Sequence, residues 1–217
     1  KYIEMGNEHH LGAGDNADDS GKHQDNVAAF PTGREYADFV NSWAPAIREQ
    51  FPDAKIGITM LGRVNNNRDR LKFWNNLIVE NIDHDNFDAY VYHIYVRPDN
   101  TIELNETTIA QIINKRTDTL EQTMIDDESK EVWITEYGVH AYTLEKTVQL
   151  TSALADYTES VANISLPQVL YRKSPDYYPT APKKYFSLLT SPDGAGLTKL
   201  GEMFRERVKK RSENSQE

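Results

Sequence analysis

The chain has 217 residues, of which 38% are hydrophobic and 27% are charged, a composition typical of a globular domain with a sizeable core. The formal net charge of -10 argues against a nucleic-acid-binding protein, because phosphate binding requires clustered Lys and Arg. The absence of cysteine excludes disulfides, cysteine nucleophiles and thiolate metal sites, and no apolar run is long enough to predict a membrane span.

Short apolar runs alternate along the chain with longer stretches of helical period, a pattern that favours βα units. Strands are predicted near Tyr2–Met5, Lys55–Met60, Ala89–Tyr95, Val132–Glu136 and Gln168–Tyr171. Helices are predicted at about Arg34–Gln50, Asp69–Asn81, Glu106–Ile125, Leu144–Val161 and Thr198–Lys210, with a frayed charged tail to the end. A long polar loop, Glu8–Gly33, separates the first strand from the first helix.

Five strands and five helices in alternation fit either a doubly wound open sheet or a (β/α)₈ barrel. The dinucleotide-binding form of the open sheet needs a Gly-rich turn after its first strand. Here that turn reads Gly6-Asn7-Glu8-His9-His10, and the later Gly12-Ala13-Gly14 is too short a match. We therefore predict an α/β fold in which residues 1–217 form one partial TIM barrel.

Two carboxylates stand at the carboxyl ends of predicted strands, where parallel α/β folds gather their functional groups. Glu8 follows the first strand and Glu136 ends the fourth. Glycosidic bond cleavage requires such a pair, one carboxyl as proton donor and the other as nucleophile or base. Whether the separation suits a retaining or an inverting enzyme is not readable from the sequence. The two residues could also be unrelated polar groups that flank strands.

The residues around both glutamates resemble glycoside hydrolase clan A. Glu4-Met5-Gly6-Asn7-Glu8 is similar to the clan's signature at the end of strand four, and Trp133-Ile134-Thr135-Glu136-Tyr137-Gly138 to that of strand seven. This resemblance implies a retaining hydrolase with Glu8 as acid/base, Asn7 as a ligand of the sugar 2-hydroxyl and Glu136 as nucleophile. The predicted strands then count as strands four to eight, and Glu136 falls on strand seven.

His93 and Tyr95 are two residues apart in the third predicted strand and therefore share a face. In the clan, a His-x-Tyr at this place lines the sugar site and its tyrosine bonds the nucleophile, which implies substrate contacts for both residues. The alternative is a core histidine with a stacking tyrosine. His9 and Tyr137 complete the expected substrate-binding set.

Other candidates carry weaker signals. His9, His10 and His23 suggest a metal site, but adjacent histidines on extended backbone point apart and no HExxH pattern exists, so we expect no metal or cofactor. Period two turns Trp133 away from Glu136, and we expect it to pack against helices. The remaining aromatic candidates lie in a Pro-rich loop and could stack on sugars or pack locally: Tyr171, Tyr177, Tyr178 and Tyr185.

If the strand count holds, strands one to three are missing. We interpret Lys1 as a cut end and expect a fragment that is inactive alone. The resemblance is to arabinofuranosidase-like or agarase-like enzymes, which implies a plant or algal polysaccharide or oligosaccharide as substrate. The expected partner is a carbohydrate, with no nucleic acid or membrane, and we expect a secreted or periplasmic bacterial protein. The alternative function is a carbohydrate-binding barrel that has lost catalysis.

Overall fold

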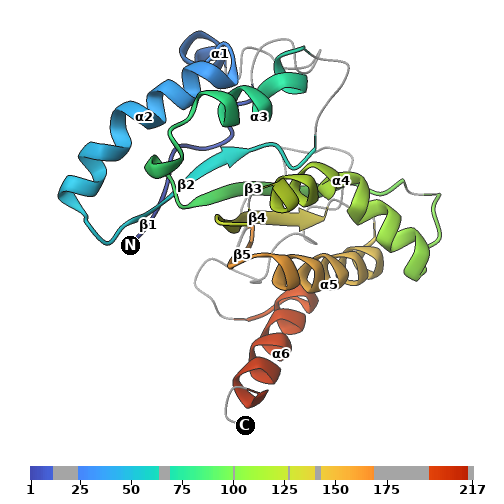
Figure 1. Cartoon of the computed structure of the whole chain (residues 1–217). Coiled ribbons are helices and arrows are strands. Elements are labelled where there is room, and N and C mark those ends of the chain that lie inside the picture. Colours follow the sequence, from blue (N-terminus) through green and yellow to red (C-terminus); the bar gives the residue numbers. More distant parts are fainter. Residues whose placement is uncertain are drawn as a thin grey trace. The chain divides into compact units, whose positions relative to one another are not determined.

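A computed structural model of the chain describes residues 1–11, 24–63, 69–99, 101–126, 128–139, 143–168 and 196–214. In these ranges strands and helices alternate as the sequence predicts, except that a short additional helix, α1, lies inside the predicted loop Glu8–Gly33 (Figure 1). The strands are β1 (Tyr2–Glu4), β2 (Lys55–Met60), β3 (Ala89–Val96), β4 (Glu131–Val139) and β5 (Ile164–Pro167). The helices are α1 (Gln24–Ala29), α2 (Gly33–Gln50), α3 (Asp69–Asn81), α4 (Glu106–Asp126), α5 (Leu144–Val161) and α6 (Lys199–Asn214), with a 3₁₀ turn η1 (His84–Asn86).

The five strands form one sheet whose spatial order follows the chain, β1-β2-β3-β4-β5. β1 pairs with β2 in parallel, with Tyr2 opposite Lys55, and β2 pairs with β3 in parallel, with Gly57 opposite Ala89. A doubly wound sheet reverses its strand order at a switch point, and the described strands show no reversal. The order is that of consecutive units in a (β/α)₈ barrel, as predicted.

The described chain divides into two compact units. Unit 1 comprises Lys1–His93, Arg116–Thr135 and Ala162–Ile164, and unit 2 comprises Ile94–Lys115, Glu136–Val161 and Ser165–Glu217. The boundaries fall inside β3, β4 and β5, so each of these strands contributes residues to both units. No helix in the described ranges is both long and apolar enough to cross a bilayer.

Helix α2 in unit 1 begins with a capping box. The Thr32 hydroxyl accepts from the backbone N–H of Arg34 at 3.2 Å, and the Glu35 carboxylate accepts from the backbone N–H of Thr32 at 2.8 Å. The helix ends at Phe51, whose N–H donates to the Ile47 carbonyl, where the sequence places Pro52 as a stop. Its buried face packs beside α3 (Figure 1), and Asn41 donates to the Asn81 carbonyl.

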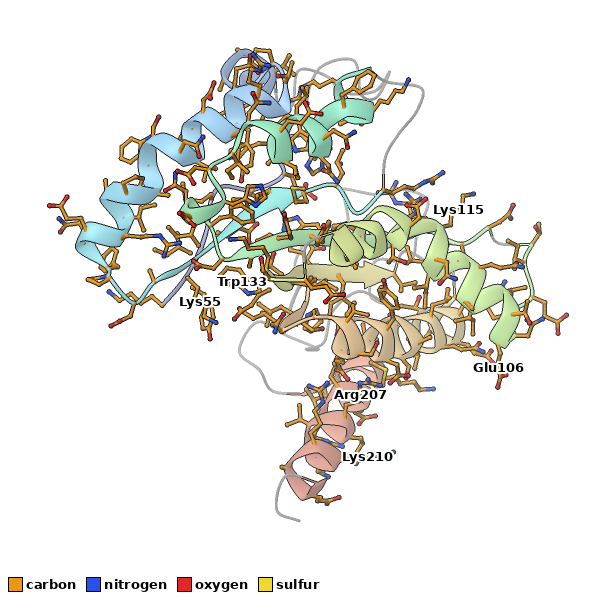
Figure 2. All side chains as sticks on the ribbon, viewed as in Figure 1. Lys55, Glu106, Lys115, Trp133, Arg207 and Lys210 are labelled. Atoms are coloured by element: carbon orange, nitrogen blue, oxygen red, sulfur yellow. The ribbon has the colours of Figure 1, made fainter. Side chains whose placement is uncertain are left out.

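The core of unit 1 is built around Trp133 (labelled in Figure 2), which is 1% exposed. Its indole packs against Ala89 and Val91 of β3, and its ring meets that of Tyr2 edge to face at 5.4 Å. The prediction that Trp133 packs against helices is therefore wrong. Small residues on the neighbouring strands, above all Gly57, leave a space on the sheet that the indole fills.

The last strand lies earlier than predicted. It runs over Ile164–Pro167 rather than near Gln168–Tyr171, of which residues 169–171 lie outside the described ranges. Asn163 fixes its start, since its side chain accepts from the Val132 N–H at 2.9 Å and its own N–H donates to the Val132 carbonyl. The strand therefore follows α5 almost directly, without the loop that the sequence prediction implied.

Ion pairs between α5 and α6 hold the end of the chain in unit 2. Arg207 (labelled in Figure 2) donates to Asp156 at 2.6 Å and to Glu159 at 2.5 Å, and Arg211 reaches Glu159 at 2.6 Å. These contacts extend α6 to Asn214, beyond the predicted end at Lys210. The charged segment that the sequence suggests is frayed is thus helical through residue 214.

We predict that Gly57→Ala lowers the free energy of unfolding by about 1–3 kcal/mol, because overpacking a filled core forces the neighbouring side chains to move. A Cβ at Gly57 would lie 2.5 Å from Val91 Cγ2 and 2.6 Å from the Trp133 ring. Urea denaturation measures the change. Gly138→Ala on β4 is the matched control, since its Cβ would meet Tyr95 at an ordinary 3.6 Å. Equal stabilities of the two variants would contradict this packing.

Candidate active site

Glu8 lies in a tight turn just beyond β1. Gly6 before it has a φ of 93°, and Glu8 itself has a φ of 48°, a left-handed conformation that is uncommon for a residue with a side chain. The Glu8 carbonyl accepts from the Leu11 N–H at 2.9 Å, which closes the turn. This backbone conformation fixes the direction of the Glu8 side chain, and strained backbone of this kind is common at functional sites.

The Glu8 carboxylate contacts His93 of β3 within unit 1. His93 Nδ1 lies 3.2 Å from Glu8 Oε1, and the His93 side chain is only 4% exposed. Nε2 lies 3.1 Å from the Thr135 hydroxyl, at the end of the unit 1 part of β4. Both ring nitrogens are therefore in contact with polar groups, which fixes the ring and, through it, the Glu8 carboxyl.

A second carboxylate, Glu4, approaches the same histidine. Its Oε1 is 3.4 Å from His93 Nε2, but this buried oxygen has no hydrogen bond of good geometry. Glu4 and Glu8 thus face opposite nitrogens of one imidazole, four residues apart in the chain. The sequence analysis missed Glu4, although its place in the motif four residues before Glu8 was a usable signal. Both ring nitrogens of His93 therefore have a carboxylate within 3.4 Å, that of Glu8 at Nδ1 and that of Glu4 at Nε2.

Asn7, His9 and His10, the other candidates near Glu8, differ in how deeply they are buried. Asn7 is exposed. His9 is half-buried, lies against Gly6 and packs on Phe30 at 4.6 Å between ring centroids, and burial lowers its pKa. His10 is buried against Trp74, and desolvation lowers its pKa to about 4. Both histidines pack locally, and neither forms a metal cluster with the other within the described residues.

Glu136 in unit 2 receives two hydrogen bonds on one oxygen. The Tyr95 hydroxyl donates to Oε2, as the resemblance implies, and the Gln168 amide donates to the same atom at 3.0 Å. The two donors hold the Glu136 side chain in one rotamer, and the carboxylate oxygen acts as a hydrogen-bond acceptor for both. Gln168 follows β5 immediately, and its N–H donates to the Tyr137 carbonyl at 2.9 Å. The sequence analysis missed its role because it placed Gln168 inside the last strand.

Tyr137 is directed away from Glu136. It is 2% exposed, its ring lies 6.3 Å from that of Phe204 on α6, and its hydroxyl bonds to Thr158 and Ser165. Burial raises its pKa to about 12. This placement gives Tyr137 a packing role and corrects the expectation that it binds substrate.

The two groups of residues are carried by the same strands. His93 and Tyr95 are two apart in β3, and Thr135 and Glu136 are consecutive in β4. Glu8 with His93 and Glu136 with Tyr95 therefore each combine a carboxylate with a β3 side chain. The tyrosines predicted beyond β5, and His23, lie outside the described residues.

Residues 35–204 match the family described as glycosyl hydrolase catalytic core. The chain belongs to this family. Membership in the glycosyl hydrolase catalytic core family assigns the chain to the glycoside hydrolases by class. A search of curated proteins found no match.

Three solved structures to which the chain is similar are glycoside hydrolases. A GH128 exo-β-1,3-glucanase from Aureobasidium namibiae is 14% identical, with a TM-score of 0.54, over 92% of this chain and 74% of that one. A GH51 α-L-arabinofuranosidase from Thermotoga petrophila is 15% identical, with a TM-score of 0.52, over 76% of this chain and 34% of that one. A glycoside hydrolase family 86 enzyme in complex with neoagarooctaose is 16% identical, with a TM-score of 0.51, over 80% of this chain and 32% of that one. The fold is therefore a partial (β/α)₈ barrel, and the chain spans about a third of the family 51 and 86 enzymes.

We predict that the stability of the protein falls as the pH drops below 6.5, because His10 must acquire a proton in a buried site. The pKa of His10 is about 4 in the folded state and 6.5 in the unfolded state. The difference stabilises the fold above pH 6.5, and this stabilisation is lost as the pH falls toward 4. Between pH 7 and pH 5 the His10 contribution amounts to about 2 kcal/mol. Denaturant unfolding of wild type and His10→Gln at both pH values measures it. The exposed His84→Gln is the control and should keep the wild-type slope. A His10→Gln slope equal to that of wild type would contradict the prediction.

Proposed function

We propose that the protein is a retaining O-glycoside hydrolase in which Glu136 is the nucleophile and Glu8 the acid/base. The observation that carries this proposal is the convergence of Tyr95 and Gln168 on one oxygen of Glu136. A nucleophilic carboxylate needs a fixed rotamer and donors that match its charge, and this residue has both. The contact of Glu8 with buried His93 supports a second catalytic carboxyl that has its own hydrogen-bond partner.

Two displacements account for hydrolysis with retention. In the first, Glu136 attacks the anomeric carbon, the bond to the leaving oxygen breaks and Glu8 gives that oxygen its proton. In the second, a water attacks the anomeric carbon, its proton passes to Glu8 and the ester to Glu136 breaks. The enzyme returns to its starting protonation, and the products are a sugar with its original anomeric configuration and a free alcohol.

The neighbouring side chains serve these two carboxyls. His93 holds the Glu8 carboxyl through Nδ1, and its other nitrogen is held by Thr135. Tyr95 keeps Glu136 in place before attack. Exposed Asn7, next to Glu8, is the proposed ligand of the sugar 2-hydroxyl. Within the same proposal, β-1,3-glucan, arabinofuranosides and agar oligosaccharides are the first substrates to assay, because they are what the enzymes of similar fold act on or bind. Secretion or a periplasmic location stays a prediction from the sequence.

The alternative function is carbohydrate binding without catalysis. A binding barrel would need aromatic and polar surfaces, but it would not need two carboxyls that each have dedicated hydrogen-bond partners. The contacts to Glu8 and Glu136 therefore favour the enzyme. Binding of these three kinds of carbohydrate with no release of reducing ends by the full-length protein would favour the alternative.

We predict that a fluorinated, mechanism-based aryl glycoside labels the full-length protein at Glu136, as read by peptide mass spectrometry. Glu136→Ala should lose roughly 10⁴-fold or more in kcat, because the covalent intermediate cannot form. Glu8→Ala should lose about 10² to 10⁴-fold on unactivated substrates, the usual contribution of a general acid.

Two outcomes would overturn these assignments. Label on another residue refutes Glu136 as nucleophile, and an inverted anomer in the first product seen by NMR refutes retention. Glu8→Ala should also regain turnover of a dinitrophenyl glycoside when azide is added, giving a glycosyl azide. Glu80→Ala, an exposed carboxylate on α3, is the control for both variants and should be fully active.

We further predict that Tyr95→Phe lowers kcat about 10- to 100-fold, because a hydrogen bond to a charged carboxylate contributes about 1.5–3 kcal/mol. Its stability should change little in a thermal melt. Tyr137→Phe removes the same hydroxyl from a tyrosine that faces away from Glu136, and it should change stability rather than kcat. Identical kinetics of the two variants would show that the Tyr95 hydroxyl does not assist the nucleophile.

A further inference from the structure

Arg70, on α3 in unit 1, makes an unusual set of contacts for a helix residue. Its guanidinium donates to four backbone carbonyls: Nη2 to His9 at 2.7 Å and to Phe30 at 2.9 Å, Nη1 to His10, and Nε to Pro31 at 3.2 Å. The group also lies over the Trp74 ring, 4.9 Å from its centroid. One side chain thus joins the chain just after β1 to the chain just before α2.

We propose that Arg70 is a positioning residue for Glu8, an inference that rests on the proposed function. The turn that begins at Glu8 closes with the Leu11 N–H on the Glu8 carbonyl, and it contains His9 and His10. Arg70 holds the carbonyls of those two residues. Arg70 therefore fixes the backbone of the turn, while His93 fixes the carboxyl of the Glu8 side chain.

The backbone of Glu8 explains why a clamp is needed. A left-handed φ of 48° is strained for a residue with a Cβ, so an unsupported turn would relax to another conformation. Relaxation would rotate the Cα–Cβ bond and carry the carboxyl away from His93. Gly6 supports the same turn on its other side, because it adopts a φ of 93° and has no Cβ, which would lie 1.7 Å from Nε2 of the His9 ring.

The chemistry of the side chain suits this task. Guanidinium offers five N–H groups in a rigid fork, so it can serve acceptors from two chain segments at once, and charge strengthens each hydrogen bond. A lysine ammonium at the same place has three donors on one atom and cannot span these carbonyls. The cation over Trp74 adds a further contact that fixes the fork.

The test uses the dependence of rate on the leaving group in the full-length protein. A phenyl glycoside needs protonation by Glu8, whereas a dinitrophenyl glycoside leaves without it, so β-D-glucopyranosides and α-L-arabinofuranosides of both aglycones are assayed. Arg70→Met should lower kcat/KM roughly 10²-fold on the phenyl substrate, a usual consequence of misplacing a catalytic group by about 1 Å. The dinitrophenyl substrate should change less than about threefold. Arg70→Lys should restore little of the loss.

Arg48→Met is the matched control. Arg48 on α2 also donates to backbone carbonyls, those of Ala54 and Asp85, which precede β2 and β3 at the opposite strand ends from Glu8. Its loss should affect both substrates equally. If Arg70→Met unfolds, Arg70→Lys serves for the same comparison. An equal loss on the two leaving groups would overturn the proposal.

A second readout does not depend on catalysis. Hydrogen exchange of the Leu11 amide, which bonds the Glu8 carbonyl, should quicken at least tenfold in Arg70→Met and stay unchanged in Arg48→Met. Unchanged exchange at Leu11 in Arg70→Met refutes the clamp even if the protein is an active glycosidase. Failure of the wild-type protein on every glycoside would instead refute the proposed function, while exchange at Leu11 would still decide the role of Arg70.

Discussion

The ring of His93 is the constraint on which the architecture around Glu8 depends. It is almost wholly buried, and its two nitrogens face Glu8 on one side and Thr135 with Glu4 on the other. Burying an imidazole costs free energy unless its ring nitrogens have hydrogen-bond partners. The loop after β1 and the strands β3 and β4 must therefore keep their register for these contacts to form. The register is set by the parallel pairing of β1, β2 and β3 and by the packing of Trp133 over Gly57.

Helices α2 and α3 supply the outer support of the same turn. The Tyr36 hydroxyl donates to the Met5 carbonyl at 2.8 Å and accepts from the Thr59 N–H at 2.9 Å, which ties the end of β1 to β2. Arg70 then holds the next residues of the chain. The backbone that carries Glu8 is thus anchored on both sides by side chains from the helices that follow it, although no one of these residues is itself a chemical participant.

Glu136 is held by side chains from the neighbouring strands. Its two donors, Tyr95 and Gln168, come from the ends of β3 and β5, which flank β4 in the sheet. Strand ends in a parallel α/β fold bring side chains from distant parts of the chain to one edge.

The sequence by itself determined the order of the strands and the bounds of α3 and α5, because period and turn residues are short-range signals. The contact of Tyr95 with Glu136 was implied instead by the resemblance of the surrounding motifs to a known family. Only the tertiary structure decided the rest. The face that Trp133 occupies depends on Gly57, 76 residues away in the chain, and the start of β5 depends on Asn163 meeting Val132. The roles of Arg70, Glu4 and Gln168 arise from contacts between segments that no local pattern relates, and the turn of Tyr137 toward α6 follows from the fit of its hydroxyl to Thr158 and Ser165.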